Sequence, residues 1–309
     1  MSFIDHLLIL PTIKLSPPCL LNDPFEQHSS DDYKKLVYKC YLSDGSPPLN
    51  YKHKKNQKKF EQEIIQNQPS NIAGRTGIVS LSESSRSLLM WAHYADQHKG
   101  IVVGFDDDFL SDIETDALTQ EKLIHTKKPI KISYDTTRFD PFEYENENGD
   151  FRGISKKLAM KLLTTKSDDW IYEKEHRYII PIAVADKIKY LGGDNKATED
   201  LINVDGQKRI SIHAETKNVK VNSDIPMTDN LYMTMSKNSN FLFLKKIDPK
   251  KIKAIFFGFR TPRENISRYV WDIEKNLATL GHIELFKYKL CDTDFKLVKE
   301  RIKKSEYIL

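Results

Sequence analysis

The residues best suited to chemistry lie in the segment Asp169–Pro181, DWIYEKEHRYIIP. In an extended strand, Glu173, Glu175 and Arg177 would project from one face, about 6.6 Å apart at each step. Two carboxylates beside an arginine create a strong local field, and coupled carboxylates can divide into acid, base and stabilising roles. An ordinary salt-bridge ladder on a sheet face is the alternative. If the chain is an enzyme, we expect its chemistry to depend on Glu173, Glu175 or both as catalytic residues.

A second candidate region is Ser85–His98, where apolar residues recur at helical spacing. The pattern predicts a helix with a serine cap at its start, Trp91 in the core, and Gly100 in a left-handed conformation at its end. The apolar face consists of Leu88, Trp91, Ala92 and Ala95. Tyr94 and His98 are amphipathic, so they either cap the core or line a pocket. Both are therefore candidate substrate-binding residues.

The segment Leu20–Glu26, LLNDPFE, is typical of a rigid turn. Asn22 and Asp23 can bond to their own backbone, and Pro24 fixes φ. We expect Phe25 to pin this turn to the core. The alternative places Asn22 or Asp23 in the wall of a binding site, which makes both substrate-binding candidates.

The sequence favours neither a metal site nor a disulfide framework. His93 and His98 would lie about 140° apart around a helix, a poor arrangement for chelating one ion. Cys19, Cys40 and Cys291 are far apart and odd in number, which is typical of small buried thiols in a reducing cytoplasm. Gly-rich phosphate loops and the GxSxG, HExxH and CxxC motifs are also lacking. We therefore expect no metal.

Composition excludes several classes of protein. Of 309 residues, 39% are apolar and 30% are charged, which excludes a disordered or collagen-like chain. The net charge of +4 is too small for this length to indicate nucleic-acid binding. No apolar run approaches the roughly 20 residues of a membrane span, and the N-terminus lacks the basic leader of a secretory signal. The expectation is a cytoplasmic protein without a membrane partner.

Two runs of like charge stand out, with five lysines in Lys52–Lys59 and seven acids in Asp106–Glu121. Such runs are usually solvated faces or loops. No aromatic residue is interleaved with the lysines to stack on bases. Both runs are candidate docking surfaces if the protein is a binding module.

Helical and strand patterns do not alternate regularly, which favours an α+β fold over a doubly wound sheet. Strands are expected at Thr76–Ser82, Ile101–Phe105, Glu175–Val184, Ile252–Phe259 and Ile283–Leu290. Helices are expected at Lys58–Gln66, Ser85–His98, Arg152–Lys166 and Pro262–Leu280. We expect one continuous domain over residues 1–309, with a single mixed, mainly antiparallel sheet, helices around it and a weak joint near 191–195. Ile252–Phe259 is apolar enough to be its central strand.

Four segments resemble, in order, the bacterial family named domain of unknown function 2971. They are LSPPCLLNDPFE, LMWAHYADQHKGIVVGF, WIYEKEHR and IKAIFFGF. The resemblance runs from about Leu10 to about Lys299, and its specific parts are Trp91–Gly100 and Trp170–Arg177. Members of that family usually begin with a Tyr-Lys-Tyr strand before the Asn-Asp-Pro-Phe turn. This sequence starts too late to contain that strand, and Val37–Tyr41 is the segment that would substitute for it.

The layout of this family looks like distant ADP-ribosyltransferase-type proteins, some of which are toxins or phage-defence effectors. That likeness implies an aromatic residue that stacks on nicotinamide and a late strand with a catalytic glutamate, often as Glu-x-Glu. Tyr94 would be the stacking residue, and Glu173 and Glu175 would form the Glu-x-Glu pair, with NAD as the substrate. Arg177 would either bind pyrophosphate or orient the glutamate.

Three functions are open on this evidence. The first is an NAD-consuming effector of a phage-defence or toxin–antitoxin system, whose glutamate stabilises an oxocarbenium-like transition state. The second is a non-enzymatic module that binds a protein or nucleic-acid target, or a partner protein of a defence operon. The third is a nuclease, suggested by Glu173 beside Lys174. A cleft lined by the two glutamates with Tyr94, His98 or Arg177 would favour the enzyme. Ion pairs between these glutamates and lysines on a flat surface would argue against it.

Overall fold

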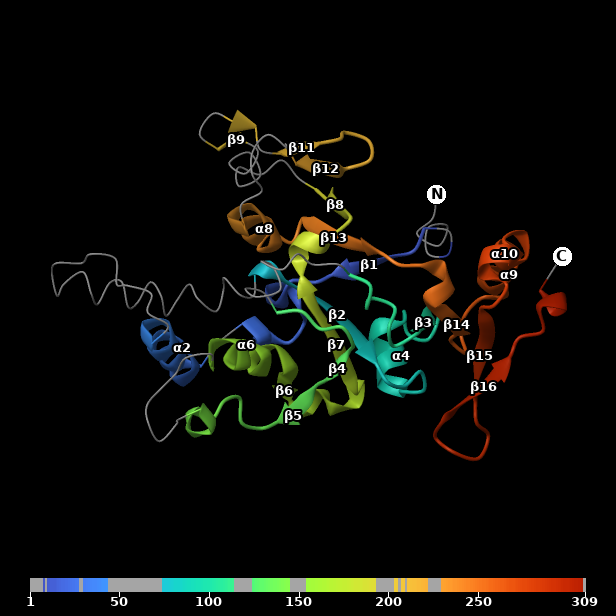
Figure 1. Ribbon diagram of the computed structural model, residues 1–309. Coiled ribbons are helices and arrows are strands. Elements are labelled where there is room, and N and C mark those ends of the chain that lie inside the picture. Colours follow the sequence, from blue (N-terminus) through green and yellow to red (C-terminus); the bar gives the residue numbers. More distant parts are fainter. Residues whose placement is uncertain are drawn as a thin grey trace.

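The chain forms a mixture of helices and mainly antiparallel sheets (Figure 1). The computed structural model describes residues 8, 10–27, 30–43, 74–113, 124–144, 154–192, 203–204, 207–208, 210–221 and 229–307. The lysine run 52–59 and the helix expected at 58–66 lie outside these residues. Every helix in the described ranges is too short or too polar to cross a membrane.

A five-stranded antiparallel sheet lies toward the top of Figure 1, in the order β1-β13-β8-β12-β11. Its strands are β1 (Thr12–Leu15), β13 (Phe241–Lys246), β8 (Lys187–Tyr190), β12 (Asn218–Val221) and β11 (Ile210–Ile212). Side chains alternate across a strand, so Phe241 and Phe243 share one buried face of β13. They pack in one core with Leu231 and Met235 of α8 (Asp229–Ser236). A separate short pair is formed by β9 (Asn203–Val204) and β10 (Gln207–Lys208).

A three-stranded sheet, in the order β2-β7-β4, carries the candidate glutamate strand. Its strands are β2 (Thr76–Ser82), β7 (Glu175–Pro181) and β4 (Ile130–Lys131). β2 and β7 pair antiparallel along their whole lengths, with Ser80 opposite Arg177. A single bridge between Ser16 and Ile78 connects this sheet to β1. The strands approach closely there, because a Cβ on Gly77 would lie 2.9 Å from the Leu15 Cβ.

A four-stranded sheet, in the order β16-β15-β14-β3, forms the C-terminal part of the molecule (Figure 1). Its strands are β3 (Ile101–Phe105), β14 (Ile252–Phe257), β15 (Glu284–Leu290) and β16 (Leu297–Arg301). β14 and β15 are parallel and are connected through α9 (Arg263–Lys275) and α10 (Leu277–Leu280). An apolar stripe on α9 covers the sheet, with Ile266 and Val270 fully buried. β14 is central, as the sequence predicts.

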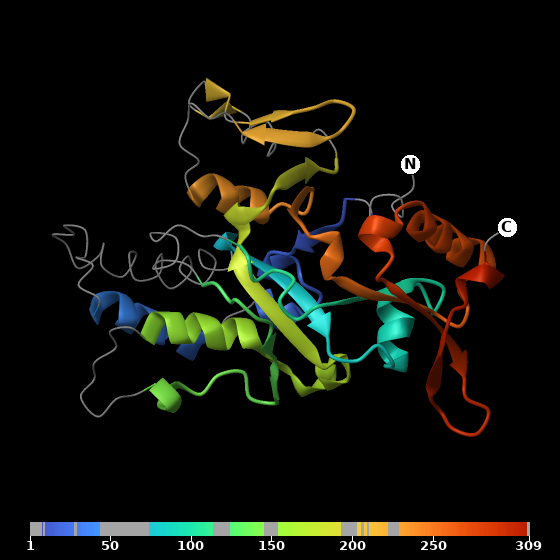
Figure 2. The same cartoon turned by 45° about the vertical axis from the view of Figure 1, so that its right-hand side comes forward.

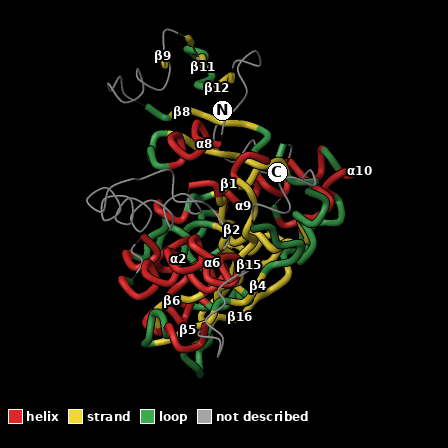
Figure 3. The backbone as a smooth tube through the Cα atoms, turned by 60° about the vertical axis from the view of Figure 1, so that its left-hand side comes forward, coloured by secondary structure: helices red, strands yellow, loops and turns green. Residues whose placement is uncertain are grey.

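Helices α2 (Asp31–Ser43) and α6 (Ile154–Thr164) lie side by side beyond the three-stranded sheet (Figure 2, Figure 3). After α6 the chain enters β6 (Thr165–Ser167), which pairs with β5 (Ser133–Asp135). The 3₁₀ helices are η1 (Pro18–Leu20), η2 (Pro24–Gln27), η3 (Pro141–Tyr144), η4 (Asp168–Glu173), η5 (Ile182–Val184), η6 (Pro249–Lys251) and η7 (Lys304–Glu306). Val37–Tyr41 lies within α2, so its interpretation as a substitute strand is wrong.

The α+β class with mainly antiparallel pairing is confirmed, but the single sheet is wrong because the strands divide among several sheets. One isolated bridge, between Ser16 and Ile78, is too little pairing to merge the sheets that contain β1 and β2 into one. The strand expected to reach Val184 gives way to η5 after Pro181, and the helix expected over 262–280 is interrupted at Asn276. The single continuous domain, with a weak joint near 191–195, stays a prediction.

The helix around Trp91 begins later than the sequence predicts. α4 (Leu88–Tyr94) is capped by Ser87, whose side chain accepts a hydrogen bond from the Met90 N–H. Trp91 is 1% exposed, which confirms its place in the core. Leu88 was expected on the same apolar face, but it is 41% exposed. The short helix α4 therefore buries Trp91 but leaves Leu88, its own first residue, exposed.

The same helix ends at Tyr94, well before His98. Three consecutive residues adopt left-handed backbones: Asp96 (φ 45°), Gln97 (φ 51°) and His98 (φ 70°). The left-handed turn predicted at Gly100 is therefore wrong, because it occurs earlier. This turn docks on the end of the C-terminal sheet, where a Cβ on Gly258 would lie 2.0 Å from the His98 carbonyl oxygen. Only glycine permits that approach.

Candidate active site

The two glutamates expected on one strand lie on either side of a turn. Glu173 ends η4, Lys174 has a left-handed φ of 46°, and Glu175 begins β7. The extended strand predicted through Glu173 is therefore wrong, and the left-handed residue is the reason. The Lys174 side chain is 58% exposed and lies 3.8 Å from Glu83. It is thus not part of the buried site.

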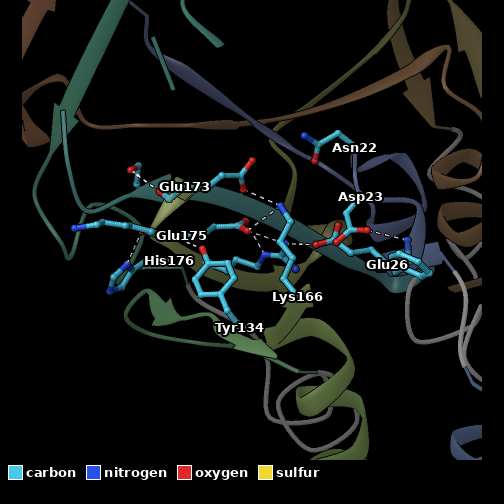
Figure 4. A network of polar contacts seen from close by, with 12 residues as sticks. Asn22, Asp23, Glu26, Tyr134, Lys166, Glu173, Glu175 and His176 are labelled. Atoms are coloured by element: carbon cyan, nitrogen blue, oxygen red, sulfur yellow. Dashed lines mark hydrogen bonds and ion pairs between the residues drawn. The ribbon is translucent and has the colours of Figure 1, made fainter. Parts of the chain in front are cut away.

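A buried lysine brings the two glutamates together. Lys166 Nζ lies 2.7 Å from Glu173 Oε2 and 3.5 Å from Glu175 Oε2. The ammonium group also lies 4.4 Å from the centroid of the Trp170 ring. The three charged side chains are each 6% exposed or less. Figure 4 shows Lys166 with the two glutamates on one side and Glu26 on the other.

Arg177 connects this group to the Asn-Asp-Pro-Phe turn. Its Nε and Nη2 donate to the two oxygens of Glu175 at 2.7 and 2.9 Å, Nη1 donates to the Leu163 carbonyl at 2.9 Å, and Nη2 also pairs with Glu26. Because each guanidinium nitrogen is engaged, Arg177 is placed to hold Glu175 and not to bind pyrophosphate. We call Glu26, Lys166, Glu173, Glu175 and Arg177 the charged cluster.

Burial and ion pairing oppose each other in the charged cluster. Burial acts to raise the pKa of Glu175, but hydrogen bonds and charge from Arg177, with the charge of Lys166, hold it below its usual value. Burial acts to lower the pKa of Lys166, but Glu175 and Glu173 hold it above its usual value. For Glu26, burial dominates over Arg177 and raises the pKa. Lys166 and Glu175 therefore form a charged pair at neutral pH.

Tyr94 connects Asn22 to the charged cluster. Its hydroxyl donates to Glu173 Oε1 at 2.6 Å and accepts a hydrogen bond from Asn22 Nδ2. Burial, together with the hydrogen bond to Glu173 and its charge, raises the pKa of Tyr94, so the phenol stays protonated and remains a donor. The side chain is 52% exposed. Tyr94 therefore joins a buried carboxylate to the solvent-exposed rim of the site.

These residues line a cavity of about 560 Å³. Its wall includes Asn22, Tyr94, Glu173, Glu175 and Arg177. A larger cavity of about 900 Å³ shares part of the same wall, including residues 80–82 and Tyr94, and continues between β2 and β3. The glutamates thus face a cleft, the arrangement expected of an enzyme, although Glu173 is also paired with a buried lysine.

Other predicted residues lie elsewhere. His98 packs against Trp91 and Phe259, with ring centroids 6.3 and 4.9 Å away, and does not line the cavity of Glu173. Asp23 is 1% exposed and its Oδ1 accepts the Phe25 N–H at 2.9 Å, which confirms the predicted turn. Phe25 does not pin the turn to the core, because it is 52% exposed.

Sequence patterns did not identify three residues of this site: Glu26, Lys166 and Tyr134. Glu26 is the last residue of the segment Leu20–Glu26, in which only Asn22 and Asp23 were candidate site residues. Lys166 follows a helix, and no hydrophobic periodicity distinguishes it from a surface lysine. Tyr134 accepts a hydrogen bond from the Glu175 N–H at 2.7 Å. A buried lysine is rarely unpaired, but burial at Lys166 depends on tertiary packing that a local pattern does not record.

The two charge runs are only partly described. Asp106 and Asp108 form ion pairs with Lys253 at 3.1 Å and Lys251 at 2.8 Å. The remainder of the acidic run after residue 113 and the lysine run lie outside the described residues. Two of the described acids of this run, Asp106 and Asp108, are therefore paired within the protein. All three cysteines are free, but only Cys40 is buried.

Part of the chain is similar to a known protein family. Residues 90–178 match the model of the family described as protein of unknown function (DUF2971). This confirms the predicted resemblance to DUF2971 over those residues. The match contains Tyr94, Lys166, Glu173, Glu175 and Arg177, and leaves Glu26 outside. No curated protein and no solved structure matches the chain.

Proposed function

We propose that this protein is an NAD-consuming enzyme of ADP-ribosyltransferase type and acts as an effector in a phage-defence or toxin–antitoxin system. The observation that carries the enzymatic part is the cleft wall where Glu173 and Glu175 lie beside the ring of Tyr94. The effector role rests on the resemblance to toxin and defence proteins. A buried set of charged residues in a cleft is the kind of place where catalytic groups are found.

In the proposed reaction, the bond between the ribose anomeric carbon and the nicotinamide nitrogen breaks. The electron pair of that bond leaves with nicotinamide, and the ribose becomes oxocarbenium-like. A water molecule or an acceptor nucleophile then bonds to this carbon and releases its proton. Three carboxyl groups face two cationic side chains in the charged cluster, so its acidic character suits a developing positive charge.

The structure supports different roles for the two glutamates. Glu173 has a hydrogen bond from Tyr94 and an ion pair with Lys166, and we assign it the contact with the ribose. Glu175 is held by both nitrogens of the Arg177 fork and is better suited to positioning Lys166. Tyr94, at the rim of the cleft, presents the aromatic surface for nicotinamide. Asn22 orients the Tyr94 hydroxyl.

The size of the cleft is consistent with a nucleotide substrate. Small-molecule sites generally have volumes of roughly 300–1,000 Å³. The cavity at Glu173 has about 560 Å³ and opens beside one of about 900 Å³. The larger cavity is lined by Met90, Trp91 and Phe256 among others, which provide apolar surface for a base.

The two alternative functions have less support. A nuclease that uses Lys174 would need this side chain in the site, but it lies at the surface. Among the described residues, no three His, Cys, Asp or Glu side chains are placed to hold a metal ion. A docking role for the acidic run is weakened by its ion pairs with Lys251 and Lys253.

The proposal is tested by incubating the purified protein with NAD labelled in the adenosine part, with and without cell lysate. We expect release of free nicotinamide, with the label found in free ADP-ribose after hydrolysis or attached to protein or nucleic acid after transfer. The products distinguish hydrolysis from transfer. Intact NAD in both conditions, at an enzyme concentration comparable with that of NAD, would contradict the proposal.

A further inference from the structure

A second cavity lies at the Glu26 end of the charged cluster. It has a volume of about 350 Å³ and shares Lys166 with the cavity of Glu173. Its walls come from the Asn-Asp-Pro-Phe turn, α2, the segment around β5 and the segment from α6 to η4. Figure 4 shows Asp23 and Glu26 together on one side of Lys166. The proposed NAD reaction gives neither Asp23 nor Glu26 a contact with the substrate, and Glu26 enters it only through the net charge of the cluster.

Four buried polar atoms in residues of this cavity wall have no hydrogen-bond partner among the described residues. They are Asp23 Oδ2, Glu26 Oε2, Tyr33 Oη and Thr165 Oγ1. Asp23 and Tyr33 are each 1% exposed, and the Glu26 side chain is 5% exposed. Buried polar groups in proteins nearly always have partners, because an unpaired one is costly. Four in one cavity wall indicate a site built for a ligand.

The cationic side chains around this cavity are already engaged. Lys161 lies 3.5 Å from Glu143, and Lys166 pairs with Glu173 at 2.7 Å. Arg138 donates to the Phe25 carbonyl at 3.0 Å and stacks on its ring. The wall of this cavity carries more acidic than basic side chains, which gives it an acidic character: the acids are Asp23, Glu26, Asp135, Asp168 and Asp169, and the bases are Arg138, Lys161 and Lys166.

We propose that this cavity binds a small organic cation with several N–H donors, such as a guanidinium or primary amine compound. The two unpaired carboxyl oxygens would accept its N–H groups, and the Tyr33 and Thr165 hydroxyls can also accept. A charged donor makes stronger hydrogen bonds to carboxylates than a neutral one does. Because Glu26 also pairs with Arg177, the occupant would contact the network that holds Glu175.

The test is isothermal titration of the full chain, without NAD, using agmatine as the probe. Agmatine carries a positive charge at each end at neutral pH, so the comparison ligand is 1,4-bis(trimethylammonio)butane, which has two positive charges and no N–H donor. The variants are Asp23→Asn and Tyr33→Phe, which remove unpartnered groups and keep the shape of the side chain. Asp31→Asn is the matched control, because Asp31 is on α2 with a side chain 86% exposed.

We expect agmatine to bind the wild type and Asp31→Asn equally, and to bind Asp23→Asn about tenfold or more weakly. Tyr33→Phe should weaken binding by several-fold and should fold normally, since its hydroxyl has no partner to lose. The proposal would be overturned if agmatine did not bind the wild type, if it bound Asp23→Asn and Tyr33→Phe as tightly as the wild type, or if 1,4-bis(trimethylammonio)butane bound as tightly as agmatine. None of these results depends on NAD turnover.

Discussion

The charged cluster buries five ionisable side chains together, whereas the four-stranded C-terminal sheet buries hydrocarbon. Ile255 and Phe257 of β14 are 0% exposed and pack with the apolar stripe of α9. Ion pairs of that sheet lie at the surface, such as Arg301 with Glu284 at 3.0 Å, where the side chains are 72% and 48% exposed. In the charged cluster, the side chains of Lys166 and Arg177 are each 2% exposed.

This difference indicates that burial in the charged cluster serves something other than stability. Apolar burial stabilises a protein without needing particular partners, at about 25 cal/mol per Å². Buried charges are expensive unless geometry and hydrogen bonds compensate, and apolar residues of similar volume often serve stability as well or better. The C-terminal sheet is thus a scaffold, while the charged cluster is the region whose composition requires a functional explanation.

The largest effect is expected from Arg177→Met. This change leaves Glu26 and Glu175 buried without their common cation, which should lower the free energy of unfolding by about 3–5 kcal/mol. Arg301→Met is the matched control in the C-terminal sheet, where loss of an exposed pair should change stability by about 1 kcal/mol or less. Urea denaturation measures both variants, and similar losses would remove the contrast between the regions.

Trp91→Ala tests the connection between the two regions. Trp91 packs with Ala95, Tyr288 and Leu297, and therefore fastens α4 to the C-terminal sheet. We expect a loss of about 3–5 kcal/mol, the usual range for a large aromatic truncation. Differential scanning calorimetry is the measurement. A melting temperature equal to that of the wild type would show that Trp91 is not a core residue.

Glu175→Gln sharpens the electrostatic side of the comparison. At neutral pH we expect a loss of about 1.5–3 kcal/mol, typical of hydrogen bonds to charged groups. The folded-state pKa of Glu175 is held below the unfolded value of 4.5. Its contribution is therefore complete above that value and disappears as the pH falls through the lower, folded-state pKa.

The measurement is denaturant unfolding of wild type and Glu175→Gln at pH 7 and at successively lower pH. The difference in unfolding free energy between the two proteins should shrink in acid. A difference that stays constant from neutral pH into acid would show that the Glu175 charge is not what the variant removes.

The smallest effect is expected from Ile255→Val, in the middle of β14. Removal of one buried methylene group from a well-packed core usually costs about 0.5–1.5 kcal/mol. Chemical denaturation should show this modest loss with an unchanged dependence on denaturant. A loss as large as that of Arg177→Met would mean that the C-terminal sheet is as sensitive as the charged cluster.

Patterns in the sequence predicted the positions of several strands. β2 and β3 have the expected bounds, and β14 is central as predicted. The end of α4 could not be predicted, because the left-handed turn at 96–98 depends on docking against Gly258. Period-2 spacing suggested that Glu173 and Glu175 act together, and they do meet, but through Lys166 and not along a strand.

The candidate site was therefore only partly predictable. Asn22, Tyr94, Glu173, Glu175 and Arg177 were named from motifs and are brought together by the fold. Glu26 required the structure because it is far in sequence from Arg177, and Lys166 required it because no local pattern records its burial. His98 was named from its helix position and lies elsewhere, since the helix ends before it.

The central claim is that Glu173 supports chemistry on NAD, and nicotinamide release by isosteric variants tests it most directly. Glu173→Gln removes the charge and keeps the shape, and loss of such a stabilising group lowers a rate by about 10²–10³-fold. Glu300→Gln, on an exposed strand at 53% side-chain exposure, is the matched control and should keep the wild-type rate. We expect a folded Glu173→Gln protein with its rate reduced by that factor, and Glu175→Gln reduced as well. Undiminished nicotinamide release by both Glu173→Gln and Glu175→Gln would contradict the account and remove the charged cluster from the mechanism.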